Sequence, residues 1–337
     1  MSHFTTFISL DNPGNAINLE AWADSYIWDD MAPFCESTED PEYLEFEDCT
    51  EDVENGYASE KVDCFKLPNG SVVARYNRLA SGFVIRDGLV YQSQAGPLKH
   101  EKRTKKARKI KALPDYPFNK LYPTVEAYAE DYCGYAYDED HRGYGYYSNP
   151  SAFWDWYLIG GRWPFTFLVK DNCKYIVEGE RGCGTENETR PAPEGYKWVA
   201  GARKRDIEWA LMKSIALGPA TETFFKLENW YLTGVLPEGA HLLAITEDGI
   251  DSWGDLVYKK GETLEQYLAR HELGPNCQYP VSAYSYLENG EYISLGDMGW
   301  WGISSNDKPE DDWRQMTQDF IDRIPDDDFL VTVDCHI

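Results

Sequence analysis

Near its carboxy terminus the chain switches between strand and helix periodicity, and this switch most constrains the fold. Residues 281–296 alternate apolar and polar side chains around Asn289-Gly290, a pair that favours a two-residue hairpin turn. Residues 309–324 then place apolar side chains at helical spacing, and residues 329–337 return to a strand-like apolar run. Because strands and helices mix without the regular order of βαβ units, we predict an α+β fold.

Other segments extend this prediction to mixed, mainly antiparallel sheets with several short amphipathic helices. An opening strand is expected at 3–10 and a helix at 17–30. Two further hairpins are expected around Asn69-Gly70 and Asp87-Gly88. We predict helices at 203–217 and 263–273, which end at Gly218 and Gly274 respectively.

Length and charge suggest how the chain divides. At 337 residues it exceeds the usual size of a single core. Residues 1–60 hold 16 acids and no Lys or Arg, whereas residues 99–111 hold eight basic residues and one acid. We therefore predict three parts, which are an acidic α/β region at 1–97, a basic linker or arm at 98–120, and an aromatic-rich α+β domain at 121–337.

The net charge narrows the classes of partner. The charge of −26 repels phosphate backbones and anionic membranes, so free duplex binding is not expected. The chain has no apolar run of membrane-spanning length and no secretory signal, so we expect a soluble, cytoplasmic protein. The acidic surface is either a solubilising face or a surface that imitates nucleic acid and docks on a basic partner.

Two segments are candidates for a protein interface. The basic stretch is either a solvated linker or a docking site for an acidic surface of another protein or of its own oligomer. Residues 132–147 are read as a loop whose tyrosines either contact a partner or pack internally. The candidate interface residues are Lys102, Arg103, Lys105, Lys106, Arg108, Lys109, Tyr135, Tyr137, Tyr144 and Tyr146.

Cysteine and histidine give no metal, cofactor or disulfide signature. None of the eight cysteines makes a C-x-x-C pair, and the six histidines make no H-x-x-x-H pair. Cys277 lies in a polar, turn-like segment, so it is either a free thiol or a candidate for an intermolecular disulfide. Cys335 and His336 are neighbours on the last predicted strand and should point to opposite faces.

Two aromatic motifs stand out. The segment FWDWYLIGGRW at 153–163 is interpreted as an aromatic corner that fixes the following strand, with a ligand pocket as the alternative. Its arginine is expected to stack on an indole or to pair with the aspartate. A Gly/Trp turn that contains Trp300 and Trp301 precedes the last helix. The central motif residues are Trp154, Asp155, Trp156, Gly160, Gly161, Arg162 and Trp163.

These motifs carry a resemblance. The MSHFT start, the WDWYLIGGRW centre and the end from Met298 to the terminal VDCHI resemble a family of uncharacterised phage and prophage proteins. Phage proteins of this size include inhibitors of bacterial immunity, among them proteins that enclose the Gabija nuclease complex. The resemblance implies a non-enzymatic, homo-oligomeric protein of the host cytoplasm that binds a DNA-targeting immune complex and blocks its access to DNA. It transfers no catalytic residue to this chain.

Two other functions remain open at this point. One is a metal-dependent enzyme acting on nucleotides or nucleic acid, with a metal held by Asp311 and Asp312 or by Asp326 and Asp328. The helix-dipole and turn preferences of aspartate explain the same pairs without a metal. The other is an accessory protein of the virion or of its assembly.

Overall fold

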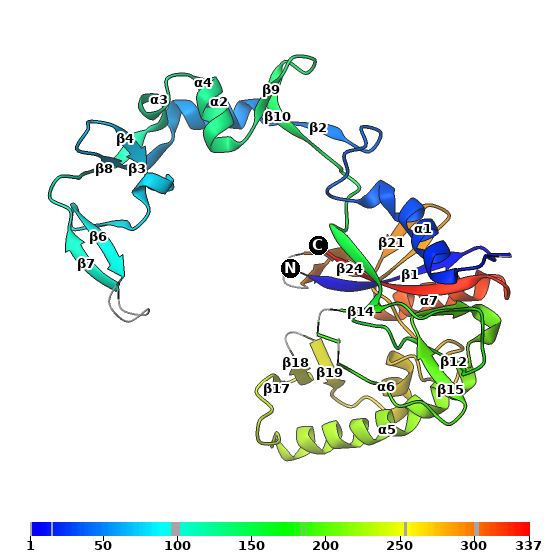
Figure 1. The fold of residues 1–337 in the computed structure, drawn as a ribbon. Coiled ribbons are helices and arrows are strands. Elements are labelled where there is room, and N and C mark those ends of the chain that lie inside the picture. Colours follow the sequence, from blue (N-terminus) through cyan, green and yellow to red (C-terminus); the bar gives the residue numbers. More distant parts are fainter. Residues whose placement is uncertain are drawn as a thin grey trace. The chain divides into compact units, whose positions relative to one another are not determined.

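The computed structural model shows an α+β protein made of two compact units (Figure 1). It describes residues 2–14, 16–95, 102–182, 184–185, 187–252, 255–299 and 303–337, with the backbone alone at 93–95 and 102–104. Unit 1 combines residues 1–38 with residues 151–337, and unit 2 consists of residues 39–150. The amino-terminal and carboxy-terminal segments of the chain therefore fold together in unit 1.

The central sheet of unit 1 is built on the first and last strands of the chain. Strand β1 (His3–Leu10) pairs antiparallel with β24 (Phe329–His336) along its whole length, from His3 opposite His336 to Leu10 opposite Phe329. On the other side of β1, β20 (Ser285–Glu288) runs parallel and continues into β21 (Glu291–Ser294). The sheet order is β13-β16-β24-β1-β20-β21, and β11 also pairs with β24. The remaining strands named here are β11 (Trp156–Gly161), β13 (Ile176–Val177), β14 (Glu180–Arg181) and β16 (Gly201–Arg203).

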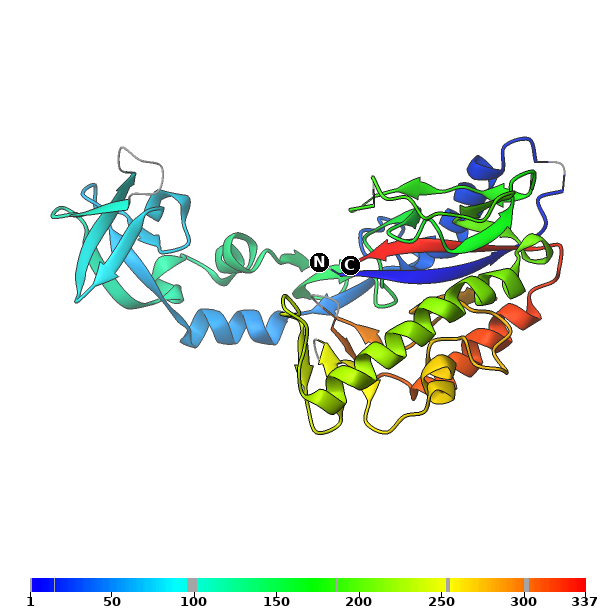
Figure 2. The same cartoon turned by 90° about the horizontal axis from the view of Figure 1, so that it is seen from below.

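The two faces of this sheet are buried by different helices. Val331 and Val333 of β24 pack in one core with Ala23 and Ile27 of α1 (Leu19–Met31). Leu330 lies on the opposite face, in a core with residues of α5 (Trp209–Thr233) and α7 (Glu310–Arg323). Figure 2 shows this order of layers, with α1 on one side of the paired first and last strands and α5 and α7 on the other. Because both faces are covered, all eight residues of β24 are buried.

The predicted elements at the carboxy terminus are confirmed. The β20–β21 hairpin turns at Asn289 and Gly290, whose φ values of 55° and 78° are those of a turn that requires positive φ. Helix α7 follows Pro309 and buries Trp313 and Phe320 of the predicted apolar stripe. The last strand occupies the predicted segment.

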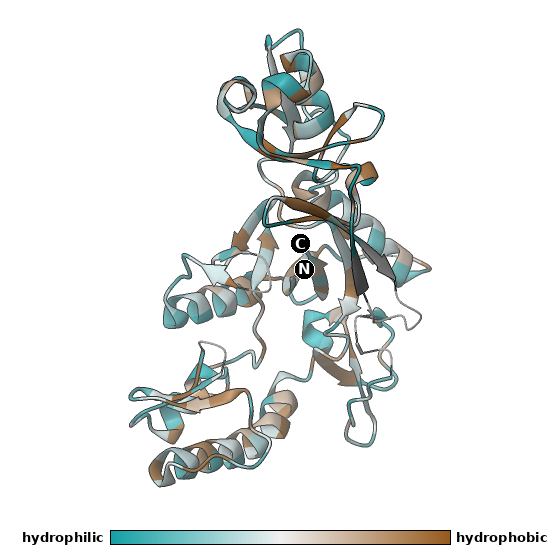
Figure 3. Ribbon diagram, turned by 90° about the vertical axis from the view of Figure 1, so that its left-hand side faces the viewer, coloured by the Kyte–Doolittle hydropathy of each residue, from teal (hydrophilic) through white to brown (hydrophobic). Residues whose placement is uncertain are grey.

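Helix α5 corrects one predicted boundary. It starts at Trp209 and runs through Gly218 and Pro219 to Thr233, where Gly234 ends it with a φ of 68°. Phe224 and Leu227 explain the longer helix, since they are buried against β18 (Gly249–Ser252), β19 (Asp255–Lys259) and α6 (Leu264–Arg270). Hydrophobic and hydrophilic residues alternate along the helix ribbon (Figure 3). The other elements of unit 1 are η1 (Ala32–Phe34), β12 (Phe167–Lys170), β15 (Tyr196–Val199), η4 (Lys204–Asp206), β17 (Leu243–Ile245), β22 (Asp297–Met298) and β23 (Ser304–Ser305).

Unit 2 forms helices and strands in three segments for which the sequence patterns predict none. Residues 36–60 contain β2 (Glu45–Asp48) and α2 (Thr50–Ser59). The basic stretch contributes β7 (Lys102–Lys106), paired with β6, and β8, paired with β3. The tyrosine-rich segment forms the β9–β10 hairpin instead of a loop. The other elements are β3 (Lys61–Lys66), β4 (Val72–Ala74), η2 (Arg78–Ala80), β5 (Phe83–Arg86), β6 (Leu89–Ala95), β8 (Lys111–Pro117), α3 (Phe118–Leu121), α4 (Val125–Tyr128), η3 (Ala129–Cys133), β9 (Ala136–Asp138) and β10 (Gly143–Ser148).

The units differ from the predicted division at 1–97, 98–120 and 121–337. Residues 1–38 belong to unit 1 because β1 is a central strand of its sheet. The predicted arm at 98–120 lies within unit 2, where its β7 and β8 are hydrogen-bonded strands. Charge changes along a chain mark surfaces, but strand pairing decides which segments fold together.

Candidate functional site

The central aromatic motif forms strand β11 and the turn after it. Trp156 pairs with His336 and Ile159 with Val333, so β11 lies against β24. Trp154 precedes the strand and is buried, and its Nε1 donates a 3.0 Å hydrogen bond to the Met31 carbonyl. This part of the motif fixes β11 against the end of helix α1.

Two histidine–aspartate pairs lie where β1, β24 and β11 meet. His3 Nδ1 is 2.9 Å from Asp334 Oδ1, and His336 Nδ1 is 2.6 Å from Asp155 Oδ1. The His3 and His336 side chains are 7% and 6% exposed, the Asp334 side chain is fully buried, and the Asp155 side chain is 34% exposed. Each carboxylate fixes the orientation of its imidazole by binding Nδ1. We name these four residues the His–Asp cluster.

Aromatic contacts hold the two imidazoles against each other. The ring centroids of His3 and His336 are 4.9 Å apart with a T-shaped arrangement. Trp156 stacks on the His336 ring at 4.9 Å and meets the His3 ring edge-on at 5.2 Å. No hydrogen bond between described residues uses Nε2 of either ring.

The Gly160-Gly161 turn connects this cluster to Arg162. Asp334 Oδ2 accepts a 2.9 Å hydrogen bond from the Arg162 backbone N–H, while its Oδ1 binds His3. Gly161 has a φ of 52°, and a Cβ there would lie 2.3 Å from the Asp334 Cβ. Glycine therefore permits both the turn and the close approach of Asp334. Neither of the two contacts expected for Arg162, the ion pair with Asp155 and stacking on an indole, is found among the described residues. Asp155 pairs with His336 instead.

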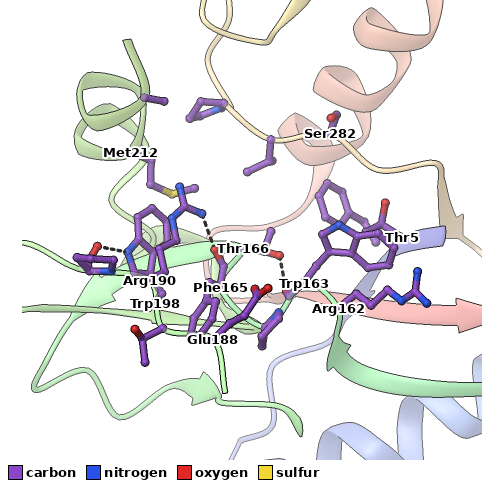
Figure 4. Close-up of a pocket in the computed structure, with 17 residues that line it drawn as sticks. Thr5, Arg162, Trp163, Phe165, Thr166, Glu188, Arg190, Trp198, Met212 and Ser282 are labelled. Atoms are coloured by element: carbon purple, nitrogen blue, oxygen red, sulfur yellow. Dashed lines mark hydrogen bonds between the residues drawn. The ribbon is translucent and has the colours of Figure 1, made fainter. Parts of the chain in front are cut away.

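A cavity of about 670 Å³ begins beside this turn (Figure 4). Arg162 and Arg190 lie at opposite ends of its labelled lining, with the indoles of Trp163 and Trp198 nearby. Neither arginine takes part in an ion pair between described residues. The lining also includes Thr5, Phe165, Thr166, Glu188, Met212 and Ser282. We name this volume the arginine–tryptophan cavity.

Arg190 is held in place without a carboxylate. Its guanidinium stacks 3.6 Å from the centroid of the Trp198 ring, and its Nη1 donates a 2.8 Å hydrogen bond to the Phe165 carbonyl. Trp198 Nε1 in turn donates to the Pro191 carbonyl at 3.1 Å. The charge of Arg190 is therefore positioned but not neutralised, although the protein as a whole carries −26. Unpaired guanidinium groups in such a protein favour an anionic ligand.

Thr5 connects the cavity with the His–Asp cluster. It pairs with Asp334 across β1 and β24, it lines the cavity, and it lies two residues along β1 from His3. Side chains two residues apart on a strand point to the same face. The cavity and the cluster therefore occupy one face of the central sheet.

The opposite face of β24 carries a separate polar group. Thr6 Oγ1 lies 2.8 Å from Ser285 Oγ and 3.3 Å from Cys335 Sγ. Burial raises the pKa of the Cys335 thiol to about 12, so the group is a protonated part of the core. Cys335 faces this side and His336 faces the cluster, as the strand alternation predicted.

Three segments that carry the resemblance converge on the cluster. His3 comes from the amino-terminal motif, Trp156 from the central motif, and Asp334 and His336 from the terminal motif. Ser2 Oγ also donates a 2.7 Å hydrogen bond to the Gly299 carbonyl of the Gly/Trp turn. Trp300 and Trp301 lie outside the described residues.

The four predicted tyrosines come together on the β9–β10 hairpin of unit 2. Tyr135 stacks on Tyr146 at 5.5 Å, and Tyr137 meets Tyr144 edge-on at 5.2 Å. Tyr144 is buried, whereas Tyr137 and Tyr146 are 47% and 41% exposed. The segment therefore combines internal packing with an exposed aromatic rim.

The structure describes the side chains of four of the six basic candidate interface residues. Lys105, Lys106, Arg108 and Lys109 are exposed and form no ion pair with another described residue. The side chains of Lys102 and Arg103 lie outside the described residues. The described residues 102–110 thus form a strand and a turn, and their four described cationic side chains have no acidic partner among the described residues.

Cys277 is half-buried rather than fully exposed, and its Sγ donates to the Tyr279 carbonyl at 3.3 Å. Burial raises the pKa of its thiol to about 11. Across the described part of the chain, no three His, Cys, Asp or Glu side chains gather as a metal site would require. Asp311 pairs with Arg314 in the first turn of α7, and Asp328 accepts from the Asn12 backbone.

Comparison of the chain with models of protein families, with curated proteins and with solved structures finds no match. The described helices include none of the length and apolarity that crossing a bilayer requires. The site therefore has to be interpreted from its own chemistry.

Sequence reasoning missed half of the site. It singled out Asp155, Arg162 and the glycines, but it gave no role to His3, Asp334, Arg190 or Trp198. His3 and His336 each occupy a predicted terminal strand, and pairing of those strands would have brought the two rings together. Arg190 and Trp198 lie in and after a polar loop with no distinguishing pattern.

Proposed function

We propose that this protein binds a small anion that carries a flat ring, such as a nucleotide, in the arginine–tryptophan cavity. The observation that carries the proposal is the pair of arginines without carboxylate partners on one cavity that also exposes indole surface. Guanidinium groups recognise phosphate, and indoles stack on planar rings. The volume of about 670 Å³ is that of a typical small-ligand site.

Binding of nucleoside monophosphates, measured by isothermal titration calorimetry, tests this proposal. At least one of AMP, GMP, CMP, UMP and TMP should bind with a Kd below about 1 mM. The matching nucleoside and ribose phosphate should each bind about tenfold more weakly or less, since each lacks one half of the recognised chemistry. If none of the five nucleotides binds, the proposal is wrong.

Arginine variants locate the binding. Arg162→Gln and Arg190→Gln should each weaken the best nucleotide about 10- to 100-fold, because a hydrogen bond to a charged group contributes about 1.5–3 kcal/mol. Arg205→Gln is the matched control, because Arg205 is an arginine of the same unit that pairs with Asp327 and does not line the cavity. An equal loss in all three variants would assign the effect to net charge rather than to the cavity.

A second candidate function rests on unit 2. Its exposed tyrosine rim favours a macromolecular partner, because tyrosine and arginine are enriched where proteins bind each other. Its free basic side chains favour an acidic surface on that partner. In this role, we propose that the protein is a phage-encoded inhibitor that binds a bacterial DNA-targeting immune complex, such as Gabija, in the host cytoplasm. It would act as a homo-oligomer and keep the complex from DNA without catalysis.

Phage plaque counts on a host that carries the defence system, with and without this protein, test the second candidate. The protein should restore plaques, and Lys105→Glu with Lys106→Glu should reduce the rescue. Lys174→Glu with Lys260→Glu is the control, because it makes the same charge change at exposed lysines of unit 1. Failure to rescue on any defended host would count against this role.

A further inference from the structure

The arginine–tryptophan cavity exposes a carboxylate as well as two guanidinium groups. Glu188 lines the cavity with Arg162 and Arg190, and Figure 4 shows its side chain between those of the two arginines. Within the described part of the chain, Glu188 forms no ion pair with either arginine or with any other cation. A ligand that bound only the guanidinium groups would cover this acceptor without offering it a donor. The cavity therefore suits a ligand that carries both an anionic group and hydrogen-bond donors.

The backbone of Glu188 is anchored to the turn at which the cavity begins. Its N–H donates a 3.0 Å hydrogen bond to the Thr185 carbonyl, and its own carbonyl accepts one of 3.0 Å from Arg181 Nη1. Thr185 is buried, and its Oγ1 donates to the Gly161 carbonyl at 2.8 Å. Because both backbone polar groups of Glu188 are already bound, ligand binding has less loop entropy to remove.

The two arginines restrict the kind of donor that Glu188 can bind. An ammonium group on a ligand would attract the carboxylate, but it would be repelled by two guanidinium groups that line the same cavity. The donors that suit Glu188 therefore belong to a neutral group, while the negative charge of the ligand lies at the arginines.

Guanine is the nucleotide base whose edge meets this requirement. Its N1–H and its N2 amino group are neutral donors side by side, so the two oxygens of one carboxylate can accept from both. Adenine, cytosine, uracil and thymine each place an acceptor next to the donor on the same edge. With any of these bases, the second carboxylate oxygen would face a lone pair.

From this combination we propose that the cavity binds a guanine nucleotide and that the Glu188 carboxylate selects the base. The inference rests on the proposed function, because it assumes that the cavity binds a nucleotide. Arg162 and Arg190 bind the phosphate, and the Trp163 indole stacks on the base. Trp163 is assigned to stacking because Arg190 already covers one face of Trp198, whereas Trp163 makes no ring contact with another described side chain.

Three purine nucleotides that differ along this edge test the assignment by isothermal titration calorimetry. GMP should bind about 10- to 100-fold more tightly than AMP, because a bidentate pair of hydrogen bonds to a base discriminates by about this factor. IMP keeps N1–H but lacks the N2 amino group, so its affinity should lie between those of GMP and AMP.

Glu188→Gln removes the charge and one of the two acceptor oxygens. It should weaken GMP about tenfold or more and change the affinity for AMP less than about threefold, so the preference for GMP over AMP falls. Glu194→Gln is the matched control, because Glu194 is an exposed glutamate that also lies between β14 and β15 but does not line the cavity. The control makes the same charge change and should keep the wild-type preference.

The outcomes separate this inference from the proposed function. If another of the five nucleotides binds more tightly than GMP, the assignment to guanine is wrong and the nucleotide site stands. If Glu188→Gln weakens all nucleotides by one factor, its carboxylate binds a shared group such as the ribose and does not select the base. If GMP is preferred equally with and without the carboxylate, another group selects the base and the role of Glu188 is wrong. If none of the five nucleotides binds, both proposals are wrong.

Discussion

The imidazoles of His3 and His336 face each other with ring centroids 4.9 Å apart, although they come from opposite ends of the chain. The contact follows from the register of β1 and β24, in which these two residues are directly opposite. A strand shifted by one residue would turn one of the rings to the other face of the sheet. The cluster therefore depends on the same pairing that forms the centre of unit 1.

We predict that Gly161→Ala destabilises the protein more than an ordinary glycine substitution. The added Cβ would lie 2.3 Å from the Asp334 Cβ at a φ of 52°, so crowding adds to backbone strain. We expect a loss of about 2–5 kcal/mol in the free energy of unfolding. Urea titration measures it.

Gly195→Ala is the control for Gly161→Ala. Gly195 has a φ of 83°, but no heavy atom lies within 4 Å of the position that an added Cβ would take, so only the backbone strain of about 1–2 kcal/mol remains. Equal losses at the two glycines would show that Asp334 is not packed against Gly161. A Gly161→Ala variant that also lost nucleotide binding would connect the turn to the cavity.

We predict a pH-dependent contribution of Glu272 to stability. Burial raises the pKa of its carboxyl from 4.5 to about 7, and the attraction of Arg314 offsets only part of this. Between these values the folded protein keeps a proton that the unfolded chain has released. The free energy of unfolding therefore falls as pH rises through this window.

Glu272→Gln removes this proton uptake. Relative to the wild type, the variant should gain about 1–3 kcal/mol of stability between about pH 5 and about pH 8, since one pKa unit corresponds to about 1.36 kcal/mol. Urea titrations at both pH values measure the difference. The exposed Glu265→Gln serves as control and should follow the wild type at both. A constant difference between Glu272→Gln and wild type would contradict the assignment.

Local sequence patterns predicted the elements whose partners are close in sequence. The β20–β21 hairpin needed only Asn289-Gly290 and the alternation around it, and α7 needed only its apolar stripe. The pairing of β1 with β24 could not be predicted from local sequence patterns, because the two strands lie at opposite ends of the chain. Their register is decided by packing across the whole unit. The composition of residues 1–60 suggested a separate acidic region and so pointed away from that pairing.

The residues of the site also fall into two groups, those with a local sequence signal and those without one. The turn at Gly160-Gly161 was visible, because adjacent glycines among large aromatic residues indicate close backbone approach. The partner of Asp155 was not, since its pairing with His336 depends on β11 lying beside β24. Arg190 belongs to a loop without periodicity, and its contact with Trp198 follows from tertiary structure alone.

We predict that Cys277 does not form an intermolecular disulfide under native conditions. A pKa of about 11, raised by burial, leaves well under 1% of the thiol as reactive thiolate near neutral pH. Iodoacetamide labelling mapped by mass spectrometry should modify Cys277 at least tenfold more slowly in the folded protein than in urea. A Cys277-dependent dimer band on a non-reducing gel would contradict this prediction.

The continuation of α5 through Gly218 predicts different effects of alanine at Gly218 and at Gly234. If Gly218 ended the helix in a left-handed conformation, alanine there would cost about 1–2 kcal/mol. Gly218 instead lies in the exposed helix interior, where alanine gains about 0.5–1 kcal/mol of helix propensity but its Cβ meets the ring of Pro219, the next residue of the helix. Gly218→Ala should therefore change the free energy of unfolding by less than about 1 kcal/mol, whereas Gly234→Ala, at the end of the helix with a φ of 68°, should destabilise the protein by about 1–2 kcal/mol. Thermal unfolding of both variants measures the two effects, and an equal or larger loss at Gly218 would contradict this position of the helix end.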